Sequence, residues 1–147
     1  MTVSNRQSRP KNQGHVAWLT KSFTMAPLQP SHAVHLAKCN LLSIFNERDA
    51  TKRKQAMAET YATDMQMYEP DKVITGHDEI SSTAGALLDA HPDWDFAPAG
   101  EVFVNHQIVT LNWTFGPVKG GDVFLMGEEG KIEKLWVMIE GVTSVKL

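Results

Sequence analysis

Two carboxyl side chains lie in apolar, strand-like segments, where they could move a proton to or from a substrate. Glu69 lies directly before Pro70 in the segment MQMYEP (65–70), and the alternation of side chains along a strand puts it on the same face as Met65 and Met67. If that face is turned inward, Glu69 is dehydrated, and dehydration makes a carboxylate the stronger base that proton abstraction needs. The alternative is a solvated turn acid, with Tyr68 as the inward residue.

Asp122 is the second candidate acid. It opens the segment DVFLMG (122–127), and a strand there would place it on one face with Phe124 and Met126. It also follows Gly120 and Gly121 directly, and an aspartate beside glycines is common in turns. A strand acid and a turn residue are therefore both open interpretations of Asp122.

The histidines and the single cysteine give weaker signals. His91 continues the apolar face of a predicted helix next to Trp94, a pattern more typical of the lip of a cavity than of a catalyst. His32 and His35 are three residues apart, but no clustered carboxylate or cysteine joins them as further metal ligands. Cys39 is expected to be a small packing residue. We therefore expect neither a metal nor a cofactor.

Composition sets the class of protein that must hold these residues. The chain has 147 residues, of which 42% are hydrophobic and 21% charged, as in a single globular domain with its own core. Its net charge of −3 argues against a nucleic-acid partner bound through phosphate contacts. No apolar run approaches the roughly 20 residues of a membrane span, and the N-terminus lacks the apolar region of a secretory signal. We expect no nucleic-acid or membrane partner and a cytoplasmic location.

Residues 1–30 differ from the rest of the chain. They are polar, they show no sustained hydrophobic period, and no acidic residue precedes Glu47. We predict a flexible basic arm over residues 1–30 and a single folded domain over residues 31–147. Two alternatives stay open for the arm. One is a mitochondrial transit peptide, which a basic, acid-free start resembles, and the other is a native start at Met25.

Hydrophobic periodicity predicts three helices and then a sheet. The helices are expected to begin at Ser31, at Asp49 and near His77, and the first two of these sites have side chains suited to capping. The strands are expected over residues 65–70, 72–75, 96–105, 106–115, 122–127 and 131–140. The predicted fold class is α+β, with one curved, mostly antiparallel sheet wrapped over three helices.

The order of these elements resembles the nuclear transport factor 2-like superfamily, which includes ketosteroid isomerases and SnoaL-like polyketide cyclases. The resemblance covers about residues 33–140. The segments that carry it are LLSIFNERD, YATDMQMYEP, ITGHDEI, IVTLNWTF and DVFLMGEEGKIEKLWVMIE. It implies a cone-shaped sheet with an open cavity between its concave face and the helices, which many relatives use as a cofactor-free site for small molecules.

The same resemblance suggests roles for the two acids. Glu69 matches the place of the general base of ketosteroid isomerases, with glutamate for aspartate. Asp122 matches the place of their protonated aspartate, which donates a hydrogen bond to the developing enolate. Those enzymes also have a tyrosine on the first helix, where this chain has Asn40 or Leu41, so a steroid isomerase is disfavoured.

Two neighbouring chemistries fit less well. Limonene-epoxide-hydrolase-like sites need an arginine between two aspartates, and this chain has no arginine after Arg53. Scytalone-dehydratase-like sites use paired histidines, which here would come from His77, His91 and His106, although His106 is expected in a turn.

The predicted function is proton abstraction from a hydrophobic, carbonyl-bearing small molecule, as in the isomerases, cyclases and dehydratases of secondary metabolism. Glu69 and Asp122 are the predicted catalytic residues. The substrate-binding walls are expected to be Met67, His91, Trp94, Leu111, Trp113, Phe115, Phe124, Leu135 and Val137. The alternative is a module of the same fold that binds a small molecule or assembles as a dimer without catalysis.

The last predicted strand suggests a partner surface. LWVMI (135–139) is apolar at every position, so both of its faces are expected to be covered. One face looks into the cavity, and the other exposes Trp136 and Met138, as an interface would. Members of the resembled superfamily commonly dimerise through this outer sheet face, so we predict a homodimer.

Overall fold

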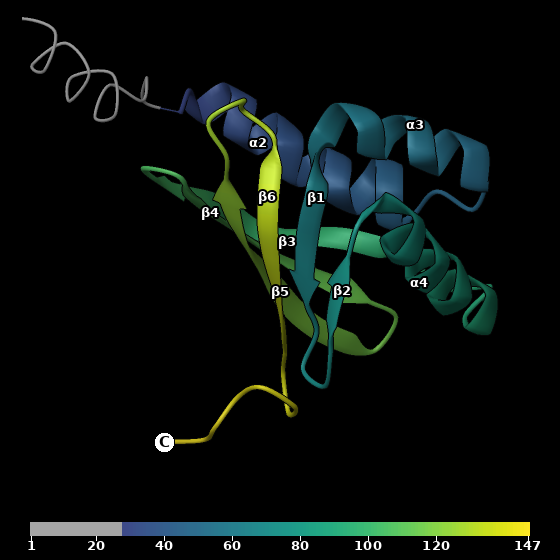
Figure 1. The fold of residues 1–147 in the computed structure, drawn as a ribbon. Coiled ribbons are helices and arrows are strands. Elements are labelled where there is room, and N and C mark those ends of the chain that lie inside the picture. Colours follow the sequence, from purple (N-terminus) through teal and green to yellow (C-terminus); the bar gives the residue numbers. More distant parts are fainter. Residues whose placement is uncertain (1–27) are drawn as a thin grey trace, which may run out of the picture.

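The computed structural model describes residues 28–147 (Figure 1). The predictions for residues 1–27, a flexible arm, a transit peptide or a start at Met25, lie outside the described residues. Leu28 already packs against the core, and the first described helix begins at Pro30, one residue before the predicted domain boundary.

Four helical segments precede or interrupt the sheet, and their bounds are α2 (Pro30–Lys38), η1 (Cys39–Phe45), α3 (Ala50–Thr60) and α4 (His77–Ala90). The predicted cap at Ser31 is wrong, because Pro30 takes the first helical turn, where its fixed backbone angle fits and its missing N–H costs nothing. The predicted cap of the second helix is confirmed, since Asp49 accepts hydrogen bonds from the backbone N–H of Thr51 and of Lys52.

The first helix changes its winding halfway. α2 continues without a break into η1, a π-helical stretch of seven residues, and such wider turns are often found at functional sites. Asn40 and Leu41 are buried in this stretch, beside Ile44. A polar amide is thereby held inside the apolar layer between helices and sheet.

Six strands form one sheet in the order β2-β1-β6-β5-β4-β3, and β1 pairs with β6 in parallel while the other neighbours are antiparallel. Their bounds are β1 (Tyr61–Tyr68), β2 (Val73–Thr75), β3 (Phe96–Asn105), β4 (Ile108–Phe115), β5 (Val118–Met126) and β6 (Ile132–Ile139). The predicted turn over 116–121 is shorter than expected, so Asp122 lies in the middle of β5 and is not a turn residue. Register shifts in β1–β6, β3–β4 and β5–β6 add local bends to this sheet.

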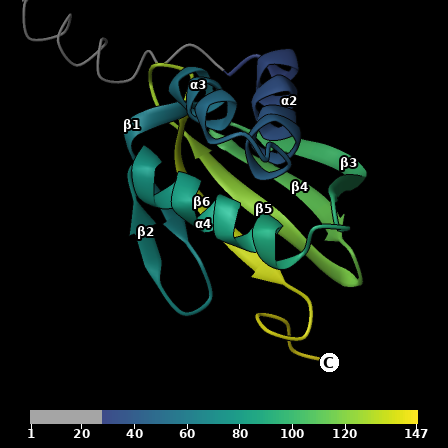
Figure 2. The same cartoon turned by 90° about the vertical axis from the view of Figure 1, so that its right-hand side faces the viewer.

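The helices form a layer on the concave side of the sheet (Figures 1 and 2). α2 packs on β3 and β4, whereas α4 packs on β1 and β2. The predicted α+β class and the curved sheet over three helices are confirmed, counting α2 and η1 as one continuous helix. Within residues 28–147, no helix is long and apolar enough to cross a membrane.

Candidate functional site

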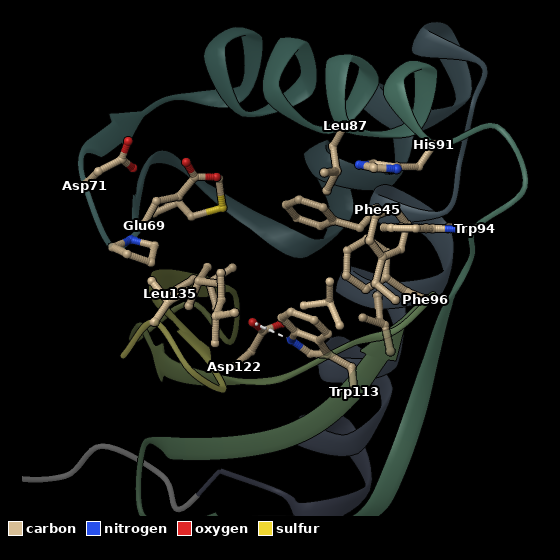
Figure 3. A pocket seen from close by; sticks show the side chains of 18 residues that line it. Phe45, Glu69, Asp71, Leu87, His91, Trp94, Phe96, Trp113, Asp122 and Leu135 are labelled. Carbon is tan, nitrogen blue, oxygen red and sulfur yellow. Dashed lines mark hydrogen bonds between the residues drawn. The ribbon is translucent and has the colours of Figure 1, made fainter. Parts of the chain in front are cut away.

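An apolar cavity of about 590 Å³ opens between the concave face of the sheet and the helices (Figure 3). Its volume is in the usual range for small-molecule sites. Nine of the predicted site residues line it, namely Met67, Glu69, His91, Trp94, Trp113, Phe115, Asp122, Leu135 and Val137. The alternating strand faces inferred from the sequence therefore brought most of the expected side chains to one place.

Two predicted wall residues do not line the cavity. Leu111 and Phe124 lie on the inward faces of β4 and β5 as expected, but they are 1% and 0% exposed and belong to the solid core. On β4 Leu111 precedes Trp113, and on the antiparallel β5 Phe124 follows Asp122, so both are displaced towards the same end of this strand pair. Their assignment as substrate-binding residues is thus corrected to core packing.

The sequence reasoning also missed several walls. Leu41 and Phe45 reach the cavity from η1, Leu87 from α4, and Phe96 from the start of β3. The apolar faces of the two helices were visible in the sequence. Which of their residues meet the open end of the sheet depends on how the helices cross it, and periodicity does not contain that information.

Aromatic rings form one side of the cavity. The His91 ring stacks on the Trp94 indole with centroids 3.9 Å apart and planes 7° apart, and Phe115 meets both rings edge-on. Phe96 stacks on Phe115 at 4.2 Å. The indole lies over Gly116, where a Cβ would come within 2.4 Å of Trp94 Cδ2. His91 therefore lies at the lip of the cavity, stacked on Trp94.

Asp122 is the buried acid of the cavity floor, with only 5% of the residue exposed. Its two carboxylate oxygens accept hydrogen bonds from different donors. Trp113 Nε1 donates to Oδ1 at 3.0 Å, and Asn40 Nδ2 donates to Oδ2 at 3.2 Å. Burial raises the pKa of Asp122 to about 7, although the hydrogen bond from Trp113 acts in the opposite direction.

Behind Asp122, a tyrosine orients the amide. The hydroxyl of Tyr61 donates to Asn40 Oδ1, which leaves the NH₂ group of Asn40 to face Asp122. Tyr61 is 1% exposed, and burial, together with the nearby charge of Asp122, raises the pKa of its phenol well above the ordinary value. The phenol therefore keeps its proton and serves as a donor in this network.

Glu69 lies at the mouth of the cavity, one residue beyond the end of β1. Its side chain is 22% exposed, and Lys72 Nζ lies 3.7 Å from its Oε2. The backbone N–H of Glu69 donates to the carbonyl of Lys72, so the two residues share a tight connection between β1 and β2. Of the two interpretations of Glu69, the inward one agrees with its place in the cavity lining, but 22% of its side chain still reaches water.

Three other histidines of the described chain have partners outside the cavity. His32 Nε2 is hydrogen-bonded with the carbonyl of Gly130 at 2.7 Å, and His77 Nε2 with that of Ala62 at 2.9 Å. His35 lies 3.5 Å from the thiol of Cys39. Over residues 28–147 no three histidine, cysteine or acidic side chains come together as a metal-binding group.

Comparison with solved structures identifies the fold. A candidate isomerase of the SnoaL-like family from Agrobacterium tumefaciens matches with a TM-score of 0.70 at 20% identity, over 76% of this chain and 99% of that chain. A SnoaL-like protein of unknown function from Burkholderia thailandensis matches with a TM-score of 0.65 at 16% identity, over 78% of this chain and 99% of that chain. A candidate SnoaL-like polyketide cyclase from Jannaschia matches with a TM-score of 0.61 at 12% identity, over 80% of this chain and 97% of that chain.

Comparison of the sequence alone with family models and curated proteins identifies no relative. The structural matches nevertheless confirm the predicted nuclear transport factor 2-like, SnoaL-like fold. Identities this low establish a shared fold and not a shared activity, so the activity has to be argued from the site.

Proposed function

We propose that this chain is a cofactor-independent enzyme that removes a proton beside the carbonyl group of a hydrophobic small molecule, as isomerases, cyclases and dehydratases do. The observation that carries the proposal is Asp122, a buried carboxyl group on the floor of an apolar cavity. With a pKa of about 7, the protonated and the ionised form of the Asp122 carboxyl group are both populated at neutral pH. A group that exchanges protons with a substrate needs this balance.

In this proposal Asp122 accepts the proton. Trp113 and Asn40 each donate to one of its oxygens, and donors of this kind stabilise the ionised form. Each oxygen keeps a second lone pair, so one of them can take a proton from a ligand in the cavity. The protonated carboxyl then returns the proton to another carbon or to a leaving oxygen, which completes isomerisation or dehydration.

This assignment reverses the roles expected from the resemblance. There Glu69 was the base and Asp122 the donor to the enolate oxygen. Glu69 is more exposed than Asp122 and lies beside the Lys72 ammonium group, which makes it a weaker candidate for the base. We assign Glu69 to the end of the ligand that lies at the mouth, while Asp122 meets the reacting carbon.

The pH dependence of the rate separates the two assignments. If the Asp122 carboxylate accepts the proton, the rate constant for proton abstraction rises with pH and levels off above about 7. If protonated Asp122 is the required donor, the rate constant falls over the same range. A rate that falls as the pH rises from 6 to 8 would contradict the assignment of Asp122 as the base.

An assay of the first chemical step needs no knowledge of the natural substrate. The full chain is incubated in D₂O with a panel of hydrophobic ketones, and the loss of α-hydrogen is followed by proton NMR. The wild type is expected to catalyse exchange, and Asp122→Asn is expected to lose it. Asp78→Asn removes an acid that is 91% exposed on α4 and serves as the matched control.

The outcomes also separate the enzyme from the alternative function. Exchange at equal rates in the wild type and in Asp122→Asn would contradict the proposed role of Asp122. If ligands quench the fluorescence of Trp94 or Trp113 but no ketone exchanges deuterium, the non-catalytic binding module is the better description.

We also propose that the protein pairs with a second copy through the outer face of the sheet. Met138 is 44% exposed on β6, and Trp136 stacks on Tyr68 of the neighbouring β1 with centroids 5.2 Å apart. These side chains form an apolar strip on the face away from the helices, which supports the predicted homodimer.

A further inference from the structure

The ionisable side chains of the cavity are strongly one-sided in charge. Three carboxyl groups line it, those of Glu69, Asp71 and Asp122, whereas no lysine or arginine among residues 28–147 does. The only other ionisable side chain among the lining residues of the described chain is that of His91, whose ring is stacked on Trp94. Glu69 and Asp71 lie together at one side of the opening, and Trp94 and Phe96 lie at the opposite side (Figure 3). A ligand that fills the space therefore meets carboxylates on one side and aromatic rings on the other.

Two basic side chains of the described chain lie near the cavity but do not line it. Lys72 approaches Glu69 from outside the cavity, and its side chain is 55% exposed to water. Arg48 lies close to the lip but donates to the backbone carbonyls of Leu88 and Trp94. Lys72 and Arg48 do not line the cavity, so an anionic group that enters it meets no lysine or arginine of residues 28–147.

The aromatic side has a matching preference. Phe45, Phe96, Trp113 and Phe115 are in mutual ring contact, directly or through Phe96, and all four line the cavity. The face of an aromatic ring carries negative charge and attracts a cation, whereas it repels an anion. Rings and carboxylates therefore select for the same sign of charge in the ligand.

We infer that the cavity takes a hydrophobic ligand that carries an ammonium group, and that it discriminates against ligands whose charge is a carboxylate or a phosphate. The inference rests on the proposed function, which makes this cavity the substrate site, and it names the class of carbonyl compound that enters. A narrow apolar cleft lined by charges of one sign concentrates their field and attracts the opposite charge. It also leaves a like charge desolvated and unpaired, which disfavours that ligand.

Three probes that share the naphthylmethyl group test the inference on the full chain, because they carry a cationic, a neutral and an anionic polar group. They are the 2-naphthylmethylammonium ion, 2-naphthylmethanol and 2-naphthylacetate, titrated by calorimetry at pH 8 and low ionic strength. We expect the ammonium probe to bind about tenfold tighter than the alcohol and about a hundredfold tighter than the carboxylate. Raising the salt concentration is expected to shrink both ratios, since added ions screen the field at the mouth.

Two matched variants locate the effect. Glu69→Gln with Asp71→Asn neutralises the mouth, and the preference for the ammonium probe over the alcohol is expected to fall to about threefold or less. Asp78→Asn with Glu79→Gln removes the same charge from neighbouring exposed positions on α4 that do not line this cavity, and the preference is expected to stay. Both variants keep the hydrophobic walls, so the affinity for the alcohol serves as a check that the cavity is intact.

Three results would overturn the inference. They are no measurable binding of the ammonium probe, a carboxylate probe that binds as tightly as it does, and an equal loss of preference in the two double variants. These results are independent of the exchange assay. If the ammonium preference holds but no ketone exchanges deuterium, the proposed function fails and the ligand class stands. If exchange is observed without the preference, only the ligand class fails.

Discussion

The floor and the mouth of the cavity each carry an acid from an inward strand face, but the two acids lie in different surroundings. Asp122 belongs to β5, a central strand of the sheet, and is almost completely buried with a donor on each oxygen. Glu69 follows the end of β1, reaches water and lies beside Lys72. Two carboxyl groups on inward strand faces therefore differ in depth and in partners, and it is burial that raises the pKa of Asp122 to about 7.

The largest expected effect tests this contrast through deuterium exchange. Asp122→Asn removes the group that takes the proton, and we expect the exchange rate to fall on the order of a thousandfold, within the usual range for general acid–base catalysis. Glu69→Gln leaves that group in place and is expected to cost less than about tenfold. The measurement is the initial rate of α-hydrogen loss for the two variants. Equal losses would erase the distinction between floor and mouth.

The second test uses the stability of the fold. Asp122 has a pKa of about 7 in the folded chain and about 3.9 when unfolded, so the folded state binds more protons between these values. The free energy of unfolding therefore falls as the pH rises from about 4 to about 7, by up to about 4 kcal/mol from this group. Above about pH 7, Asp122 is expected to cause no further decrease in the free energy of unfolding.

Urea unfolding at pH 4, 5.5 and 7.5 measures this contribution. In Asp122→Asn the decrease from Asp122 is expected to disappear, while Glu69→Gln leaves Asp122 in place and is expected to keep the decrease that Asp122 causes. A difference between wild type and Asp122→Asn that does not change with pH would show that the floor acid is not perturbed by burial.

A smaller effect probes the network behind the floor. Tyr61→Phe removes the donor to Asn40 Oδ1, so the amide can turn its oxygen towards Asp122 and favour the protonated carboxyl. We expect the pKa of Asp122 to rise by about half a unit to one unit, the worth of a typical hydrogen bond. The carboxyl carbon of Asp122, followed by NMR during a pH titration, reports the change.

The control for this variant is Tyr68→Phe. The Tyr68 hydroxyl donates to Gln66, and the Tyr68 ring stacks on Trp136, away from Asp122. Its removal is expected to leave the titration of Asp122 unchanged. A pKa that moves equally in both variants, or in neither, would remove Tyr61 from the network that sets the protonation of the floor.

The smallest effect on the cavity is expected from its outer side. Trp136→Asp places a charge in the proposed dimer surface, and light scattering is expected to report a monomer. The exchange rate is expected to stay within about twofold of the wild type, because Trp136 does not line the cavity. An unchanged dimer would place the interface elsewhere, and a large loss of exchange would link the outer face to the floor.

Much of the scaffold followed from local patterns. Alternation along 108–115 identified Val109, Trp113 and Phe115 as inward residues, and all three are buried. The Asp49 cap and the helix after Gly76 were also visible, because capping and helical periodicity depend on neighbours a few positions apart. The order of the elements was sufficient to identify the fold.

The network around Asp122 was not visible in the same way. Asn40 reaches Asp122 across 82 residues of sequence, and Tyr61 reaches Asn40 across 21. In the sequence, Asn40 marked only the absence of a tyrosine, and Tyr61 was only part of a motif. No local pattern encodes these contacts, since they exist only once helix, strand and sheet are packed together.

By itself, then, the sequence determined which residues share a face of each strand, because side-chain alternation is a local property of the backbone. Only the tertiary structure decided how deep each inward residue lies. Trp113 and Asp122 line the cavity, whereas Leu111 and Phe124 on the same two strands are enclosed by packing. Depth controls how far water reaches a side chain. It therefore distinguishes core residues from cavity walls, and the buried carboxyl group of Asp122 from the more exposed one of Glu69.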